Sequence, residues 1–457
     1  MHDERQRGCV EWMKGVGRAF GAVLLLASAL ASASESAPAL NAQRYDADYP
    51  TLNYAGPATH NAFARLQARL DRGELALDYS PSRGYLDALL KALNIDPSSQ
   101  VLVYSKTSLQ IDLIEASTPR AVYYNDEVYV GYVQNAPLLE LAAMDSELGL
   151  VFYTLVNKPS AARQFDREAG RCLTCHDTYS MMGGGVPRVV VLSAAVDGAY
   201  NPPARETSEE TSDQTPLRER WGGWYVTGQH GEQLHLGNLP IDGDPKLSAR
   251  TDAQRLNLQS LDGLFNVRPY LTNKSDIVSL MVLEHQAGVQ NLITRANLKV
   301  HTVLARLEQG AVPAPRTLWD LSPRGQAAIK AMVEPLVRTM LFVDAVEFTS
   351  PIAGNAGYEA WFQGQGPRDR QGRTLRELDL KTRLFRYPLS YFIYSASFDS
   401  LPEYIRQYLY GRFAEILQGR DSSGLYAGLN ADDRKATLEI LMATKPDFGR
   451  LTGMSLP

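Results

Sequence analysis

Residues 122–156 read VYYNDEVYVGYVQNAPLLELAAMDSELGLVFYTLV, and this stretch decides the fold class. Its apolar runs are rich in β-branched and aromatic residues and come in two pairs, each separated by a short polar turn. The runs are 122–124, 128–133, 138–144 and 150–156, and the turns are Asn125-Asp126-Glu127 and Asp145-Ser146-Glu147. Strands joined by such short turns pair antiparallel. The stretch therefore predicts two successive β-hairpins.

Further elements are predicted on both sides of the hairpins. Apolar residues at three- and four-residue spacing predict helices over 59–71, 83–93, 276–308, 323–345, 401–418 and 431–444. Additional strands are predicted at 101–104, 109–114, 186–196 and 224–227. Ser275 is the N-cap candidate of the helix over 276–308. The predicted fold class is α+β, with antiparallel hairpins in the N-terminal half and a mainly helical C-terminal half.

The N-terminus predicts a cleaved secretory signal over residues 1–33. Basic residues precede the apolar stretch Phe20 to Leu30, and Ala31-Ser32-Ala33 supplies the small residues of a cleavage site. A membrane anchor is the alternative, but this apolar run is shorter than the ~20 residues that span a bilayer. No later segment is long and apolar enough to form a transmembrane helix. The mature chain is therefore expected to be exported, for example to a periplasm, without a transmembrane span.

The composition and the domain organisation are those of a globular protein. Of 457 residues, 44% are hydrophobic and 21% are charged, which excludes a disordered or collagen-like chain. The net charge of −5 argues against nucleic acid as a partner. The regions that we expect are an N-terminal α+β region over 34–160, a segment with strands and an exposed loop (201–220) over 161–245, and a mainly helical region over 246–457.

The cysteines carry the chemistry of the chain. Cys9 lies in the predicted signal, which leaves Cys172 and Cys175 in the sequence Cys172-Leu173-Thr174-Cys175-His176. This C-x-x-C-H spacing is the attachment signature of c-type haem. The two thiols add to the porphyrin vinyl groups, and the adjacent His176 ligates the iron from the proximal side. The motif occurs once, so it predicts one covalently attached haem c.

Two other interpretations of the cysteine pair stay open. A dithiol oxidoreductase also uses C-x-x-C, although it places the motif in a βαβ unit near the start of its domain. A structural zinc site needs four ligands, and the chain has no second C-x-x-C.

The second axial ligand has several candidates, and His285 is the first of them. On a helix it shares a face with Met281 and Gly288, and the glycine would leave room for a flat porphyrin. Met281 is its companion candidate, and the other candidates are His60, His230, His235, His301, Met181 and Met182. His230 and His235 are also candidates to bind a second metal, but the sequence predicts that they lie at the surface. Trp221 and Trp224 are predicted to pack in the core.

Haem propionates need cationic or hydrogen-bonding partners. Arg171, Arg188 and Arg295 are the candidates closest in sequence to the motif and to His285. Gly183-Gly184-Gly185 predicts a turn with backbone freedom beside the haem.

The cysteine motif resembles that of cytochromes c, with Cys172, Cys175 and His176 in the motif positions. The longer pattern is similar to large exported proteins with a single motif of this kind, on the stretches 125–134, 221–237, 275–297 and 381–401. It differs from small class I cytochromes c, in which the motif lies near the start of a much shorter chain. The resemblance implies haem binding, electron transfer and a redox partner protein. A haem enzyme with an open distal site, acting on a small oxidant such as peroxide or a nitrogen oxide, is the alternative.

Overall fold

The structure is a computed structural model, and it describes residues 54, 56, 59–159, 163–168, 170–176, 186–194, 208–238, 255–307 and 317–454. Several predictions lie outside these residues. They are the signal over 1–33, the ligand candidates Met181 and Met182, the turn Gly183-Gly184-Gly185, and residues 201–207 of the predicted loop.

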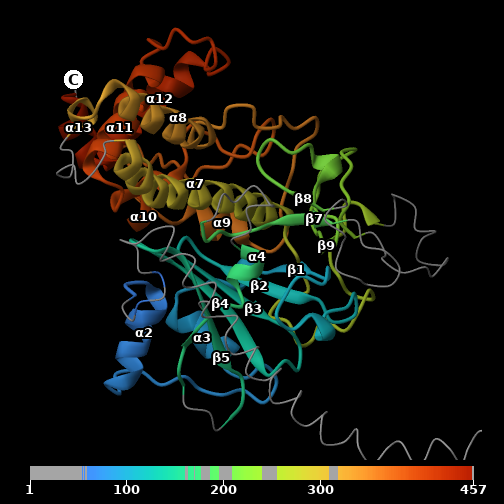
Figure 1. Ribbon diagram of the computed structural model, residues 1–457. Helices are drawn as coiled ribbons and strands as arrows, with labels where there is room; N and C mark the ends of the chain where they lie inside the picture. The colour runs from blue at the N-terminus through green and yellow to red at the C-terminus, as the bar shows by residue number, and fades with distance from the viewer. Residues whose placement is uncertain are drawn as a thin grey trace, which may run out of the picture.

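The central feature is an antiparallel sheet (Figure 1). In the described part of the chain its strand order is β6-β5-β4-β3-β2-β1-β9. The strands are β1 Val101–Val103, β2 Arg120–Tyr124, β3 Val128–Tyr132, β4 Leu138–Asp145, β5 Gly149–Val156, β6 Asp166–Arg167 and β9 Trp224–Tyr225. A separate pair joins β7 Leu192–Ala194 to β8 Ser208–Glu210. Both predicted hairpins are therefore confirmed.

The two hairpin turns are closed by the polar residues that predicted them. The Asn125 side-chain oxygen accepts the N–H groups of Glu127 and Val128 at 3.0 and 3.1 Å. Asp145 likewise accepts the N–H group of Glu147 at 3.0 Å. Such side-chain bonds to the following backbone stabilise tight turns. Gly149, which starts β5, has φ of 73°, and a Cβ there would lie 2.4 Å from a side-chain atom of Thr294. The hairpin is thus fitted closely against the helix that carries Thr294.

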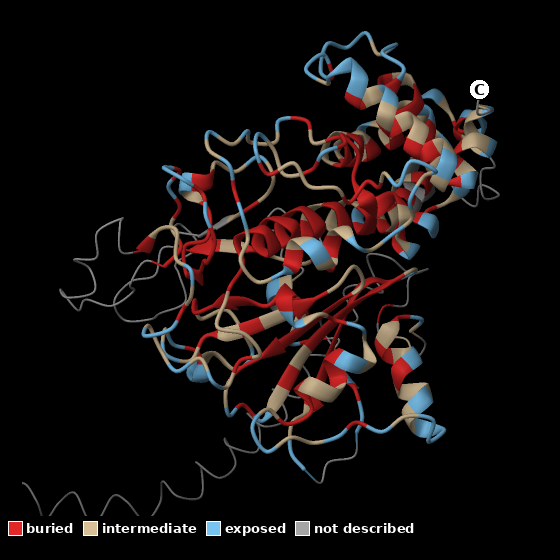
Figure 2. Ribbon diagram, turned by 180° about the vertical axis from the view of Figure 1, so that it is seen from behind, coloured by how far each residue is buried: buried red, intermediate tan, exposed pale blue. Residues whose placement is uncertain are grey.

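That helix, α7 (Ile277–Leu307), lies across one side of the sheet and is buried along most of its length (Figure 2). Its N-cap is Asp276, whose carboxylate accepts the N–H groups of Val278 and Ser279 at 2.8 and 3.1 Å. The prediction of Ser275 as the cap was wrong by one residue. The Ser275 hydroxyl instead donates to the Tyr225 carbonyl at 2.6 Å, which ties the start of α7 to β9.

The remaining helices lie on either side of this layer (Figure 1). On the side of the sheet away from α7 are α2 (Ala62–Asp71) and α3 (Leu86–Ala92). The C-terminal helices are α8 Pro323–Met340, α9 Tyr358–Gln363, α10 Ala396–Asp399, α11 Glu403–Leu417, α12 Ala431–Thr444 and α13 Pro446–Thr452. The α+β class is confirmed. None of the helices that the structure describes is both long and apolar enough to cross a membrane.

Three local predictions were wrong. The segment 109–114 contains a 3-10 turn, η3 (Ile111–Leu113), instead of a strand. Its Gln110 side chain takes the place of a strand partner, because it exchanges hydrogen bonds with the backbone of Leu138 at 3.1 and 3.2 Å. Of the strand predicted over 186–196, the described residues 186–194 form a strand only at β7. Finally, residues 208–220 of the predicted exposed loop are packed into the structure as β8 and the 3-10 turn η6 (Leu217–Glu219), and Arg220 is buried.

Candidate functional site

The cysteine motif forms one helical turn, α4 (Leu173–His176), beside the sheet on the side that faces α7 (Figure 1). The Cys172 carbonyl accepts the N–H groups of Cys175 and His176 at 3.2 and 3.0 Å, which closes the turn. Leu173 is buried and anchors it. Both cysteines are free, Cys172 against the core and Cys175 exposed. The turn therefore presents two thiols and an imidazole from five consecutive residues.

The His176 imidazole is held in one orientation. Its Nδ1 lies 2.9 Å from the Arg188 carbonyl, and the Arg188 N–H donates to the His176 carbonyl at 3.0 Å. A carbonyl only accepts, so Nδ1 carries the hydrogen and Nε2 keeps its lone pair. Burial lowers the pKa of His176 to about 4, so the ring is neutral at neutral pH. Nε2 has no hydrogen bond to any described residue and is free to ligate a metal.

A second contact links this histidine to α7. Asn291 of α7 pairs with the backbone of Val189, accepting its N–H at 2.8 Å and donating to its carbonyl at 2.7 Å. Val189 follows Arg188, the residue that orients His176. Phe152 of β5 packs against the imidazole with ring centroids 4.6 Å apart. His176 is thus fixed directly by a contact to the sheet and indirectly, through Arg188 and Val189, by the long helix.

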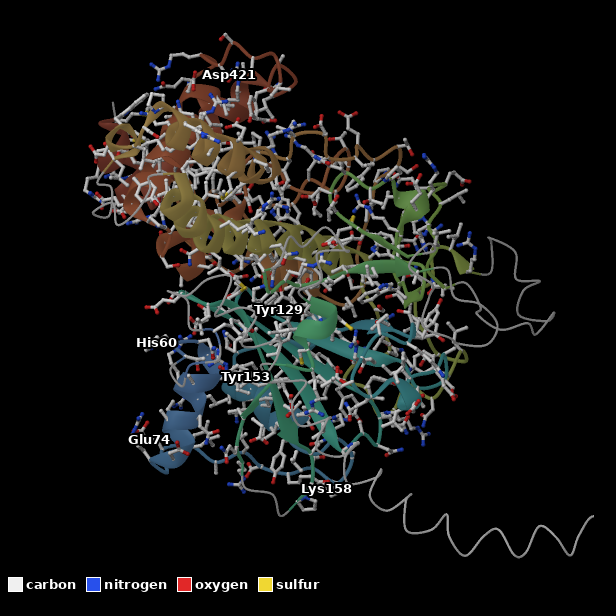
Figure 3. The ribbon with its side chains drawn as sticks, in the orientation of Figure 1. His60, Glu74, Tyr129, Tyr153, Lys158 and Asp421 are labelled. Atoms are coloured by element: carbon white, nitrogen blue, oxygen red, sulfur yellow. The ribbon has the colours of Figure 1, made fainter. Side chains whose placement is uncertain are left out.

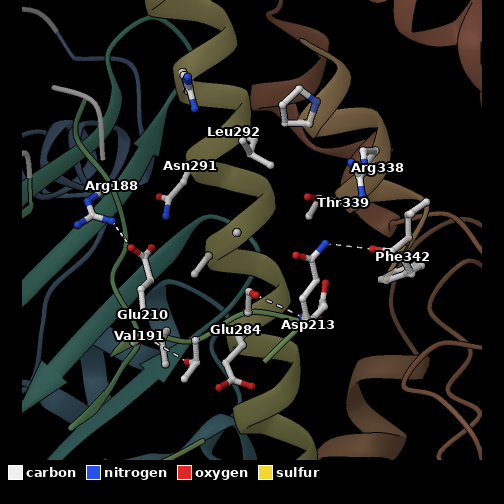
Figure 4. Close-up of a pocket in the computed structure, with 18 of the residues that line it drawn as sticks. Arg188, Val191, Glu210, Asp213, Glu284, Asn291, Leu292, Arg338, Thr339 and Phe342 are labelled. Atoms are coloured by element: carbon white, nitrogen blue, oxygen red, sulfur yellow. Dashed lines mark hydrogen bonds and ion pairs between the residues drawn. The ribbon is translucent and has the colours of Figure 1, made fainter. Parts of the chain in front are cut away.

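A cavity of about 480 Å³ adjoins this segment (Figure 4). Its walls come from residues 186–191 and 210–214, from α7 and from the C-terminal end of α8. The volume lies within the range of about 300–1,000 Å³ that is typical of cofactor and small-molecule sites. Gly288 of α7 is one of the lining residues, and a Cβ at this position would meet no atom within 4 Å. The space that the sequence predicted over Gly288 is therefore part of this cavity.

Two of the three predicted propionate partners line the cavity. Arg188 is 2% exposed and forms an ion pair with Glu210, while its Nε and Nη2 are buried and have no partner among the described residues. Arg295 also lines the cavity and forms no hydrogen bond or ion pair with the described residues. Arg171 instead pairs with Glu168 near the surface. Of the predicted partners, Arg188 and Arg295 are therefore the two that could meet an anionic group in the cavity, while the lining residue Arg338 pairs with Asp344.

His285 is buried, but both its nitrogens are already hydrogen bonded. Nδ1 lies 2.7 Å from Asp213 Oδ2, and Nε2 lies 2.7 Å from Ser390 Oγ. The ring also packs against Phe342, with centroids 4.7 Å apart. An iron ligand must offer a free nitrogen lone pair, so this geometry does not support His285 as the distal ligand.

Two further ligand candidates, Met281 and His60, lie away from the cavity. Met281 is in the core, and His60 is at the surface beside α2 (Figure 3). His301 lies in α7, but its side chain is outside the described residues. None of the described residues that line the cavity is a histidine or a methionine.

The surface prediction for His230 and His235 was wrong, because each is only 2% exposed. Their rings pack together with centroids 4.8 Å apart, and burial lowers the pKa of both imidazoles. His230 Nε2 accepts the Asn257 N–H at 3.0 Å, so Nδ1 carries the hydrogen. His230 thus has no lone pair for a metal. Trp221 packs against His235, and Trp221 and Trp224 are both buried, as predicted.

Two properties of the described residues bear on the alternatives to haem attachment. A reactive dithiol needs a lowered thiol pKa, but burial raises the pKa of Cys172 to about 12. No cluster of three or more metal-ligating side chains occurs among the described residues.

Comparisons with family models, curated proteins and solved structures gave no match for this chain. The interpretation of the site therefore depends on its residues alone.

Sequence reasoning missed Asp213, Asn291 and Ser390. Each is a polar residue outside any recognisable motif, and its partner lies far away in the sequence. The nearest sequence signal of this network is a polar residue within the apolar pattern of the 276–308 helix, and that signal indicates His285 alone.

Proposed function

We propose that this chain is an exported monohaem c-type cytochrome that transfers electrons. Cys172 and Cys175 would hold the haem through thioether bonds, and His176 would be the proximal ligand. The observation that carries the proposal is the Nδ1 hydrogen bond from His176 to the Arg188 carbonyl. Metal-ligating histidines usually donate their other ring N–H to a carbonyl or carboxylate, which fixes the tautomer that ligates.

The cavity supports the same proposal. Arg188 would bind a propionate through its unpartnered Nε and Nη2, and Arg295 supplies a second cation. Gly288 leaves the apolar side of α7 open to a flat ring. These residues would neutralise and orient the group, while Val191 and Leu292 contribute apolar surface to the same cavity.

Electron transfer is the proposed activity because a bound haem iron cycles between Fe(III) and Fe(II). Cys175 is exposed, so the porphyrin edge attached to it would lie close to solvent. A redox partner protein could then exchange electrons at this edge. The C-x-x-C-H attachment and the predicted signal both agree with an exported location.

A haem enzyme is the second candidate function, and one observation favours it. The described lining of the cavity has no histidine or methionine to close the distal side of an iron, but it contains the carboxylates Asp213 and Glu284. Burial raises the pKa of Glu284, and perturbed carboxylates in a cavity are candidates for acid–base work. The substrate would be a small oxidant that fits the remaining space.

An absorption spectrum of protein matured in an exporting host tests both functions. We expect a haem spectrum that changes on reduction, recorded with and without carbon monoxide. Carbon monoxide binding would favour the enzyme, and a haem that ignores it would favour the electron carrier. Protein without a haem spectrum would contradict both.

The cavity assignment has its own prediction. Gly288→Leu is expected to lower the haem content of the purified protein strongly, because the added side chain would fill the space over α7. Gly411→Leu is the matched control: Gly411 is also a helical glycine where a Cβ meets no atom within 4 Å, but it is exposed on α11. Haem absorbance per protein measures the difference. Equal haem content in the two variants would place the haem outside this cavity.

A further inference from the structure

The cavity beside α7 is lined by two buried charged groups of opposite sign that lack hydrogen-bond partners. Arg188 is 2% exposed, and its Nε and Nη2 have no partner among the described residues. Glu284 is fully buried, and its Oε1 has no partner there either. The Thr211 hydroxyl donates its one hydrogen to the Val191 carbonyl at 3.1 Å, so it has none for Glu284. A buried polar group without a hydrogen bond costs free energy, which a ligand satisfying both groups would remove.

Asp213 adds a second acceptor at the Glu284 end of the cavity. Its side chain forms one hydrogen bond with the described residues, from His285 Nδ1 to Oδ2 at 2.7 Å, which leaves Oδ1 open. Arg220 holds the two residues together, because its Nη1 lies 2.9 Å from Glu284 Oε2 and its Nη2 donates to the Asp213 carbonyl at 3.0 Å. This end of the cavity therefore presents two carboxylate oxygens to a group that donates hydrogen bonds.

The cationic end lies further along α7 (Figure 4). The Asn291 side chain is hydrogen bonded to the backbone of Val189, the neighbour of Arg188. Arg295, one helical turn beyond Asn291, also lines the cavity and adds a second positive charge to this end. The cavity is therefore polarised along the helix, with cations at one end and carboxylates at the other.

The distance between the two ends sets the length of a ligand that meets both. Glu284 and Asn291 are seven residues apart on α7, which corresponds to about 10 Å along the helix axis. A free α-amino acid carries both charged groups on its α-carbon, so it is too short to reach both ends. An extended peptide covers ~3.3–3.6 Å per residue, so about three residues span this distance.

We propose that the cavity binds a short extended peptide, with its terminal ammonium group at Asp213 and Glu284 and its terminal carboxylate at Arg188. The ammonium group has three hydrogens, enough for Oδ1 of Asp213 and Oε1 of Glu284. The carboxylate accepts from Nε and Nη2 of Arg188, the bidentate geometry that suits a guanidinium. The cavity volume of about 480 Å³ leaves room for peptide side chains, and Val191 and Leu292 supply apolar wall beside them.

The inference goes beyond the proposed function, because none of the motif residues that would hold the haem is among the described lining residues. A haem propionate and a peptide carboxylate offer the same chemistry to Arg188. A haem has no cationic group for Asp213 and Glu284, whereas the peptide has one. The test must therefore separate these two sources of the carboxylate.

The test measures peptide binding to the purified full chain by titration calorimetry. Triglycine is the probe, and N-acetyl-triglycine and triglycinamide are its matched controls, because each lacks one of the two terminal charges. We expect triglycine to bind, and each blocked peptide to bind about 10-fold more weakly or less, since charge-assisted hydrogen bonds are the strong ones. Glycine should bind more weakly than triglycine, because it reaches only one end.

Two variants assign the ends of the peptide. Arg188→Gln should weaken triglycine binding but leave triglycinamide binding unchanged, because that peptide has no carboxylate to lose. Asp213→Asn should weaken triglycine binding and leave N-acetyl-triglycine binding unchanged. A structural disturbance would weaken all three peptides, and either variant suffices if the other does not fold. Arg83→Gln and Asp87→Asn are the matched controls, since this ion pair lies at α3, outside the cavity lining.

Three results would overturn the inference. The first is the absence of triglycine binding to the folded wild type. The second is equal affinity for triglycine and triglycinamide, which would assign the Arg188 end to a propionate. The third is triglycine binding in Arg188→Gln and Asp213→Asn that equals binding in the control variants. Haem absorbance of the same samples is recorded, so a failure of peptide binding and a failure of haem attachment are separate results.

Discussion

Replacing both Cys172 and Cys175 with alanine is expected to abolish covalent haem completely. Each thioether bond needs one thiol, and the mature chain is expected to hold only these two. The two thiols lie on one helical turn with His176, so no other residue can replace them. Haem staining after denaturing gel electrophoresis measures the effect. Stain that persists on the double variant would show that attachment does not depend on this motif.

Two further variants separate attachment from ligation. Cys9→Ala is the matched control, because Cys9 lies in the predicted signal and should leave haem staining intact. His176→Ala is expected to keep haem attached but to change its visible spectrum, since only the proximal ligand is lost. A His176→Ala spectrum identical to that of the wild type would contradict the assigned ligand.

The sheet could be predicted because its signals are local. The turns at Asn125 and Asp145 are closed by the side chains of those same residues, and the flanking strands have strong β propensity. The error at Gln110 arose from a contact across 28 positions of sequence. Its side chain satisfies the backbone of Leu138, and no local pattern predicts such a replacement of strand pairing.

The candidate site was predictable only in part. Cys172, Cys175 and His176 form a contiguous motif, and Arg188 and Gly288 lie close to sequence features that suggested a role. The network of Asp213, His285 and Ser390 could not be predicted, because its contacts span 72 and 105 positions. Burial of the 208–220 segment brings Asp213 to α7, and this packing overrides the polar composition that had predicted an exposed loop.

The buried ion pair between Arg220 and Glu284 is expected to dominate the stability of this region. The side chains are 4% and 0% exposed, and Arg220 Nη1 lies 2.9 Å from Glu284 Oε2. Arg220 also donates to the carbonyls of Thr215 and Asp213 at 2.6 and 3.0 Å. Removing one partner of such a pair leaves a buried charge without compensation, which costs about 3–5 kcal/mol. Arg220→Met should therefore lower the free energy of unfolding by this amount, measured by denaturant titration.

Arg218, two residues before Arg220, provides a matched control. Arg218 pairs with Glu219 at the surface, where the side chains are 70% and 41% exposed. Exposed pairs contribute about 0–1 kcal/mol, so Arg218→Met should change stability little. Adding Glu284→Gln to Arg220→Met removes the orphaned charge and should recover part of the loss. Equal destabilisation by Arg218→Met and Arg220→Met would contradict the role given to the buried pair.

The stability lost in Arg220→Met is expected to depend on pH, because Glu284 is the charge that it leaves without a partner. Burial already raises the pKa of Glu284 in the folded protein, and Arg220 lowers it. Without Arg220 the folded pKa rises further above the unfolded value, so the folded state binds a proton that the unfolded state releases. Stability then falls as pH rises through this window and is regained in acid, where the carboxyl is neutral in both states. The difference in the free energy of unfolding between Arg220→Met and the wild type should therefore become smaller as pH falls. A difference that does not change with pH would instead attribute the lost stability to the broken hydrogen bonds with the carbonyls of Thr215 and Asp213.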